Sequence, residues 1–124
     1  MKLLWLQASG CGGCTQSLLG AESRAGVFAQ LAASGIELLF HPAVGEASGE
    51  EFLDLLDAAA DGRLSFDILC VEGALLRGPG GSGRFHMLSG SGRPMIDWVR
   101  ALAAQAQHVL AKIGRASCRE TVYI

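Results

Sequence analysis

Short continuous runs of apolar residues alternate with segments of helical periodicity, and this alternation restricts the fold more than any other feature of the sequence. The apolar runs are residues 3–7, 36–40, 66–71 and 108–111. Between them, residues 15–33, 50–61 and 95–106 carry apolar residues at helical spacing. This order predicts an α/β fold with a parallel sheet. Because the strands are continuously apolar, we expect helices on both faces of the sheet, in a three-layer arrangement.

Two cysteines and an acidic residue follow two of these predicted strands. Cys11 and Cys14 come after the first strand and are separated only by Gly12 and Gly13, and Glu72 comes directly after the third. Ligands of open α/β sheets bind outside the carboxyl ends of the strands. If the first and third strands are neighbours, the cysteine loop and Glu72 face each other at this edge. The two glycines leave room for both thiolates to reach one soft metal centre.

A Cys-x-x-Cys pair is compatible with several kinds of site. An iron–sulfur cluster needs two further ligands, and a zinc knuckle needs a second pair at similar spacing. A dithiol oxidoreductase places the pair where a helix begins after a strand, as this sequence does. Cys70 is expected to be a small buried residue within the third strand. The residues alone leave open a cluster loop, a redox dithiol and a binding module without redox chemistry, although two glycines suit a cluster loop better than a redox pair.

Composition excludes some classes of function. The chain has 124 residues and a formal net charge of −2, without the basic patch of a nucleic-acid-binding protein. No apolar run approaches the roughly 20 residues of a membrane span. The sequence shows no secretory signal, so its four cysteines favour a reducing, cytoplasmic location.

A glycine-rich segment at residues 78–85 mimics a phosphate-binding loop, but Arg84 and Phe85 stand where that loop needs a lysine and a hydroxyl residue. We expect this segment to lie against a partner or another loop.

Residues 4–19 read Leu-Trp-Leu-Gln-x-x-Gly-Cys-x-x-Cys-Thr-x-Ser-Leu-Leu, and the sequence of residues 1–111 resembles the N-terminal flavodoxin-like domain of a nickel–iron hydrogenase small subunit. Shorter segments at residues 41–42, 71–73 and 92–95 fit the same family. The resemblance implies a flavodoxin-like fold, here truncated after about four strands. It also implies that Cys11 and Cys14 bind the proximal 4Fe-4S cluster, which accepts electrons from dihydrogen oxidation. The residues it places near that cluster are Glu72, Gly10, Gly12, Gly13 and Thr15.

The resemblance further implies a partner and a role. The nickel–iron centre belongs to a separate large subunit, so no residue of this chain is expected to be catalytic. Residues 67–79, 83–88 and 94–100 look most like the dihydrogen-sensing regulatory branch of the family. A sensor relays its redox state to a signalling partner such as a histidine kinase. The uptake branch without a leader is the alternative.

The last residues of the chain break the strand–helix pattern. Residues 112–124 resemble the conceptual translation of a short-read sequencing adapter, and the alternative is a genuine polar tail. We therefore expect residues 1–111 to be an incomplete domain and residues 112–124 to be non-native. In the family, the third cluster ligand follows the fourth strand in an Ile-Gly-x-Cys segment, which would start just after Ala111. Cys118 is then not expected to be a ligand, and the fragment alone, with two of the four ligands, is expected to be inactive.

Overall fold

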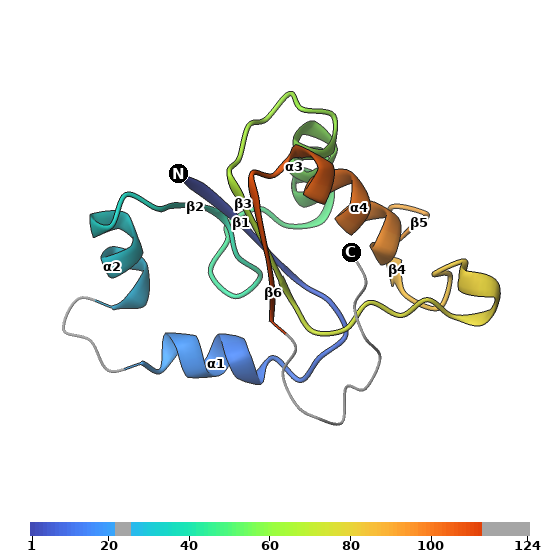
Figure 1. Cartoon of the computed structure of the whole chain (residues 1–124), viewed down its shortest axis with the longest axis horizontal. Coiled ribbons are helices and arrows are strands. Elements are labelled where there is room, and N and C mark those ends of the chain that lie inside the picture. The colour runs from blue at the N-terminus through green and yellow to red at the C-terminus, as the bar shows by residue number, and fades with distance from the viewer. Residues whose placement is uncertain (22–25, 113–124) are drawn as a thin grey trace.

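A parallel sheet forms the centre of the computed structural model, which describes residues 1–21 and 26–112 (Figure 1). The four strands lie in the order β2-β1-β3-β6. The central strand β1 pairs in parallel with β2 and with β3, and β3 pairs in parallel with β6. The bounds of the strands are Lys2–Gln7 for β1, Glu37–Phe40 for β2, Ile68–Glu72 for β3 and His108–Lys112 for β6. The predicted flavodoxin-like α/β fold is confirmed, and the first and third strands are neighbours.

Helices cover both faces of this sheet. On one face lie α1 (Gly13–Leu19) and α2 (Val27–Ala33), and on the other lie α3 (Gly49–Ala60) and α4 (Met95–Gln105) (Figure 1). Because successive side chains of a strand point to opposite faces, each strand contributes to two cores. The larger core packs Leu4 and Leu69 against Leu56 of α3 and Leu102 of α4. The smaller core contains Leu3, Ile68 and Cys70, and Leu31 of α2 packs against it. The sheet therefore lies between two hydrophobic cores.

The structure differs from the sequence prediction in the segment after the cysteines. Residues 15–33 were predicted to form one helix, but the structure has two, α1 and α2. Gly20 ends α1 and Gly26, at φ +77°, precedes α2. Glycine has low helix propensity, so two glycines six positions apart interrupt a periodicity that otherwise reads as continuous.

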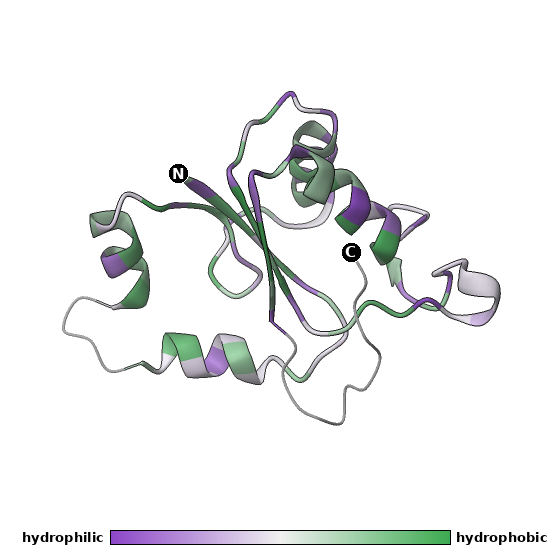
Figure 2. Cartoon of the chain, in the orientation of Figure 1, coloured by the Kyte–Doolittle hydropathy of each residue, from purple (hydrophilic) through white to green (hydrophobic). Residues whose placement is uncertain are grey.

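The segment at residues 77–92, which includes the glycine-rich residues 78–85, also contains ordered structure. Pro79–Gly81 form a short 3-10 turn, η1. Two short strands, β4 (Met87–Leu88) and β5 (Arg93–Pro94), pair antiparallel. Figure 2 shows hydrophobic residues along the central strands. The turn in the glycine-rich segment is pale in this figure, because its residues are neither strongly hydrophobic nor strongly hydrophilic. Among the described helices, none is long and apolar enough to cross a membrane.

Candidate functional site

The loop that carries the cysteines is tied to the carboxyl end of β3 by backbone hydrogen bonds. The Ala8 N–H donates to the Glu72 carbonyl at 2.7 Å. Ser9 and Ala74 form an isolated antiparallel bridge, with N–H···O distances of 3.1 and 2.8 Å. These bonds continue the pairing of β1 with β3 beyond the ends of both strands. The cysteine loop therefore begins from a fixed position at the edge where ligands of such sheets bind.

Gly73 lets the two loops approach each other closely. Its φ is +95°, and a Cβ atom placed on it would lie 2.5 Å from the Ser9 carbonyl oxygen and 3.2 Å from the Gly10 nitrogen. On the other side, a Cβ on Gly10 would lie 3.4 Å from the Gly73 Cα. Only a residue without a side chain fits at Gly73, because both its backbone conformation and the available space exclude Cβ.

The two cysteines lie on either side of a glycine pair at the start of α1. Gly12 has a left-handed conformation with φ +69°, and its carbonyl accepts a hydrogen bond from the Gln16 N–H at 3.0 Å. A Cβ on Gly13 would lie 3.2 Å from the Cys11 sulfur. Cys11 is exposed, Cys14 is half-buried, and both are free thiols. The glycine pair therefore leaves the Cys11 sulfur accessible, while Cys14 is set into the first turn of the helix.

Glu72 is bound to the start of the same helix. The Thr15 N–H donates to Glu72 Oε1 at 3.1 Å, and the Thr15 hydroxyl donates to Glu72 Oε2. Only 2% of Glu72 and 4% of Thr15 are exposed. A buried carboxylate without partners would be strongly unfavourable, and these two donors satisfy one lone pair on each of its oxygens. The residue that ends β3 thus fixes the residue that follows Cys14.

Further titratable groups are buried on the face of the sheet that α1 and α2 cover. His41, which follows β2, is fully buried, and its ring centroid lies 4.9 Å from that of Trp5 and 5.5 Å from that of Phe28. Burial lowers the pKa of His41, and the charge of Glu72 acts in the opposite direction. Burial, with a smaller contribution from Glu72, raises the pKa of the Cys70 thiol to about 11. Cys70 is therefore a buried neutral thiol at physiological pH.

The sequence analysis did not predict the burial of His41. The available signal was its position directly after the apolar residues of β2, at the same edge as Cys11 and Glu72. The Nε2 atom of His41 and the Nε1 atom of Trp5 are buried, and neither has a hydrogen-bond partner within the described part of the chain.

Cys11 and Cys14 supply only part of the ligand set that a metal centre needs. Within residues 1–21 and 26–112, no group of three or more His, Cys, Asp or Glu side chains is arranged to hold a metal ion. Cys118 and residues 113–124 of the expected non-native tail lie outside the described residues, whereas Lys112 is the last residue of β6.

Comparison with known proteins relates the chain to subunits of redox enzymes. The protein-family model described as "NADH ubiquinone oxidoreductase, 20 Kd subunit" matches residues 11–118. A search of curated proteins finds no significant match. Among solved structures, the [NiFeSe] hydrogenase of Desulfovibrio vulgaris Hildenborough is similar to this chain with a TM-score of 0.69 and 26% identity over 89% of this chain and 38% of that chain.

Two further solved structures have the same fold. The Ni-Fe-Se hydrogenase of Desulfomicrobium baculatum has a TM-score of 0.67 and 28% identity, over 89% of this chain and 40% of that chain. The actinobacterial-type NiFe-hydrogenase of Ralstonia eutropha H16 has a TM-score of 0.67 at 23% identity, over 89% of this chain and 35% of that chain, and supports the fold alone. The chain thus spans 35 to 40% of the length of these hydrogenase chains.

Proposed function

The chain belongs to the family of the 20 kDa subunit of NADH ubiquinone oxidoreductase, and on this premise we propose that it is the electron-transfer small subunit of a nickel–iron hydrogenase. In this proposal Cys11 and Cys14 bind the proximal 4Fe-4S cluster, which accepts electrons from dihydrogen oxidation. The observation that carries the proposal is the cysteine loop itself. It presents two sulfurs around Gly12 and Gly13 at the carboxyl edge of the sheet, and Glu72 holds its end in place.

The donor set fits an iron–sulfur cluster as far as the described residues reach. Cysteine thiolates are the usual ligands of such clusters, and Cys11 is exposed while Cys14 lies one residue from the anchored Thr15. A bound cluster would supply one-electron transfer. The chain's own contribution is to fix the spacing of the two sulfurs, through the glycine pair and the Thr15–Glu72 hydrogen bonds, and to place them at the edge of the sheet.

We further propose where the remaining ligands come from. The complete gene is expected to continue after Ala111 with an Ile-Gly-x-Cys segment that provides the third cysteine and, further on, with the fourth. Residues 112–124 are then non-native and Cys118 is no ligand. The nickel–iron centre belongs to a large subunit, so the fragment alone is expected to be inactive.

The regulatory role is a finer part of the same proposal. It is supported by the sequence of residues 67–79, 83–88 and 94–100, which resembles the dihydrogen-sensing branch. In that role the protein is cytoplasmic, pairs with the large subunit and signals to a histidine kinase. The uptake branch is the alternative within the family. A dithiol oxidoreductase that uses Cys11 and Cys14 is the alternative outside hydrogenases.

Iron loading of the complete chain tests the proposal. We expect anaerobic reconstitution of the completed gene product to give a brown protein with about four iron and four sulfide per proximal site, in addition to any further clusters. Cys11→Ser is expected to abolish the proximal cluster signal in electron paramagnetic resonance. The matched control is Cys70→Ala, because Cys70 is a buried cysteine of the same domain and should leave iron content unchanged.

Two results would contradict the proposal. A reversible Cys11–Cys14 disulfide without iron uptake would identify a dithiol oxidoreductase instead. For the tail, Cys118→Ser in the 124-residue chain is expected to leave residual iron binding unchanged, and a loss of iron in that variant would show that Cys118 is a native ligand.

A further inference from the structure

A glutamine at the end of β1 lies against the glycine pair that separates the two cysteines. Gln7 is the last residue of β1, and a Cβ atom placed on Gly12 would lie 3.0 Å from Gln7 Nε2. A side chain at Gly12 would therefore press on the Gln7 amide, in addition to straining a backbone whose φ is +69°. At the next residue, a Cβ on Gly13 would lie 3.2 Å from the Cys11 sulfur. The Gln7 amide and the Cys11 sulfur thus both border the glycine pair.

The register of the sheet explains why the Gln7 side chain reaches this loop. Gln7 pairs with Glu72 in the parallel register of β1 and β3, so the two side chains lie on the same face of the sheet. Trp5, two residues earlier in β1, packs against the smaller core under α1 and α2. The polar residues that end the two central strands therefore both point to the start of α1, where Glu72 binds Thr15 and Gln7 contacts Gly12.

The Gln7 amide is a donor that the described part of the chain does not use. The Thr15 N–H and hydroxyl donate to Glu72, and the Gln16 N–H donates to the Gly12 carbonyl. In contrast, the half-buried side chain of Gln7 forms no hydrogen bond with any described residue. A primary amide carries two N–H donors. The loop therefore has an unused donor group beside its cysteines.

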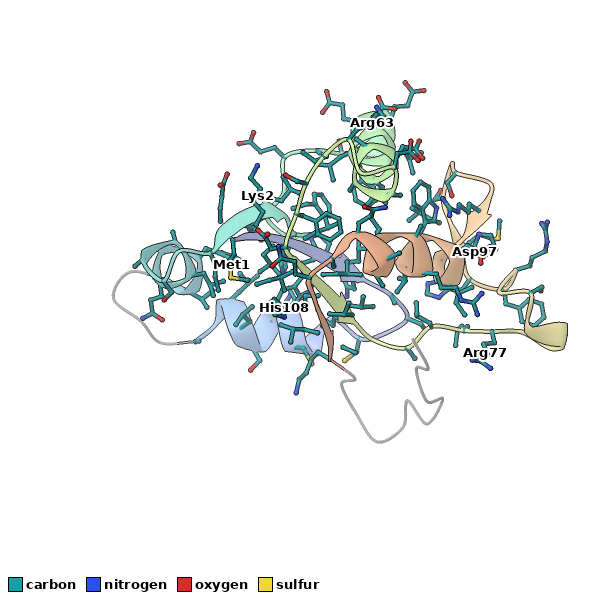
Figure 3. The ribbon with its side chains drawn as sticks, turned by 45° about the horizontal axis from the view of Figure 1, so that its top comes forward. Met1, Lys2, Arg63, Arg77, Asp97 and His108 are labelled. Carbon is teal, nitrogen blue, oxygen red and sulfur yellow. The ribbon has the colours of Figure 1, made fainter. Side chains whose placement is uncertain are left out.

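The segment that carries the cysteines has no charged side chain to balance negative charge. Residues 3–21 contain neither a basic nor an acidic residue. Figure 3 shows Arg63 beyond α3 and Asp97 on α4, the two helices that cover the opposite face of the sheet from α1. Hydrogen bonds to the sulfur atoms of an iron–sulfur cluster raise its reduction potential, because they stabilise the more negative, reduced state. Neutral N–H donors are therefore the groups of this segment that can provide such stabilisation.

We propose that the Gln7 amide donates a hydrogen bond to a sulfur atom of the cluster that Cys11 and Cys14 bind, and thereby raises the reduction potential of that cluster. This inference rests on the proposed function, because it requires a cluster at these two cysteines. Gln7 is not a ligand in this proposal, and iron binds without its amide. The alternative is a packing role, in which the Gln7 side chain only supports the turn at Gly12. The two roles differ because packing depends on side-chain shape, whereas a hydrogen bond depends on the N–H group.

Redox titration of the reconstituted complete chain, followed by electron paramagnetic resonance, tests this inference on the signal that Cys11→Ser removes. Gln7→Met keeps the length of the side chain but removes both N–H donors. We expect it to retain the wild-type iron content and to lower the equilibrium constant for one-electron reduction about tenfold, which is a shift of about 59 mV to more negative potential. Gln7→Leu has a different shape but lacks the same donors, and the same shift is expected. The matched control is Gln30→Met, at an exposed position of α2, which should leave the potential unchanged.

Iron content and reduction potential separate this inference from the proposed function. Full iron loading of Gln7→Met and Gln7→Leu at the wild-type potential would overturn the inference and leave the proposed cluster site standing. A shift in one of these two variants but not in the other would assign the effect to packing and would overturn it as well. If only one variant binds iron, its potential decides in the same way. Loss of iron from both, with iron retained in Gln30→Met, would make Gln7 a structural part of the loop instead. A wild-type chain that binds no iron would overturn both proposals.

Discussion

At the scale of single residues, the contact between Thr15 and Glu72 links the cysteine loop to the sheet. Glu72 ends a strand whose residues are all buried, and its carboxylate accepts hydrogen bonds from both the backbone and the hydroxyl of Thr15. Thr15 directly follows Cys14. The residue that follows the second cysteine is therefore held by a side chain from β3, far away in the sequence.

Removal of the Thr15 hydroxyl tests this link. Thr15→Val keeps the shape of the side chain but leaves one oxygen of the buried Glu72 carboxylate without a donor. We expect the free energy of unfolding to fall by about 1–3 kcal/mol, measured by urea denaturation. Thr15→Ser is the control, because it keeps a hydroxyl and should lose less than half as much. Equal losses in both variants would show that packing of the Thr15 methyl group matters instead.

The sequence predicted some of these residue positions and missed others, for physical reasons. The order of elements placed Glu72 at the same edge as Cys11 and Cys14, because parallel strands share their carboxyl edge. The partner of Glu72 was not predictable, since a hydrogen bond depends on side-chain direction and not on spacing. The burial of His41 was not predictable either, because it comes from Trp5 and Phe28, which reach it from other elements.

At the scale of elements, two loops that follow adjacent strands are packed backbone to backbone. The Ser9–Ala74 bridge and the close approach at Gly73 extend the contact between β1 and β3 into the cysteine loop. A strand pair that continues into its loops gives those loops the rigidity of the sheet. The backbone hydrogen bonds between the two segments therefore fix the start of the cysteine loop against the segment that follows β3.

Gly73→Ala tests the contact between the two loops. The new Cβ would lie 2.5 Å from the Ser9 carbonyl oxygen at a φ of +95°, so the loops must separate. We expect the free energy of unfolding to fall by at least about 2 kcal/mol, measured by urea denaturation. Gly35→Ala is the matched control: its φ is +81° but nothing lies within 4 Å of the added atom, so only backbone strain contributes. Equal losses in the two variants would exclude a role for the close approach.

The sequence predicted which segments form helices and which form strands, but it predicted the bounds of these elements less accurately. Continuous apolar runs identified all the strands of the main sheet, because burial on both faces imposes that pattern. The single helix predicted over residues 15–33 was wrong, since its periodicity carried across Gly20 and Gly26. The β4–β5 pair was missed because two-residue strands leave no periodic signal.

At the scale of the whole molecule, the two faces of the sheet differ in chemistry. The face under α3 and α4 has an apolar core, whereas the face under α1 and α2 buries His41 and Cys70 beside the cysteine loop. Polar groups in a core reduce stability unless they are satisfied. The face that carries the candidate site therefore buries a titratable histidine in its core.

Acidification should destabilise the chain through its buried histidines. Burial lowers the pKa of both His41 and His86 below their ordinary value of 6.5. As the pH falls through 6.5, the unfolded state binds protons that the folded state does not, so the free energy of unfolding falls, by at most about 1.4 kcal/mol per pH unit for each histidine. Above about pH 7.5 neither group contributes, because both states are then unprotonated.

Urea denaturation between pH 7.5 and 5.5 measures this dependence. We expect His41→Gln to reduce the slope of the free energy of unfolding against pH, and the double variant His41→Gln/His86→Gln to reduce it further, whatever their stability at pH 7.5. The slope separates proton linkage from lost packing, because a packing defect lowers stability equally at every pH. A slope in the double variant as steep as that of the wild type would show that buried histidines do not control the acid sensitivity of the fold.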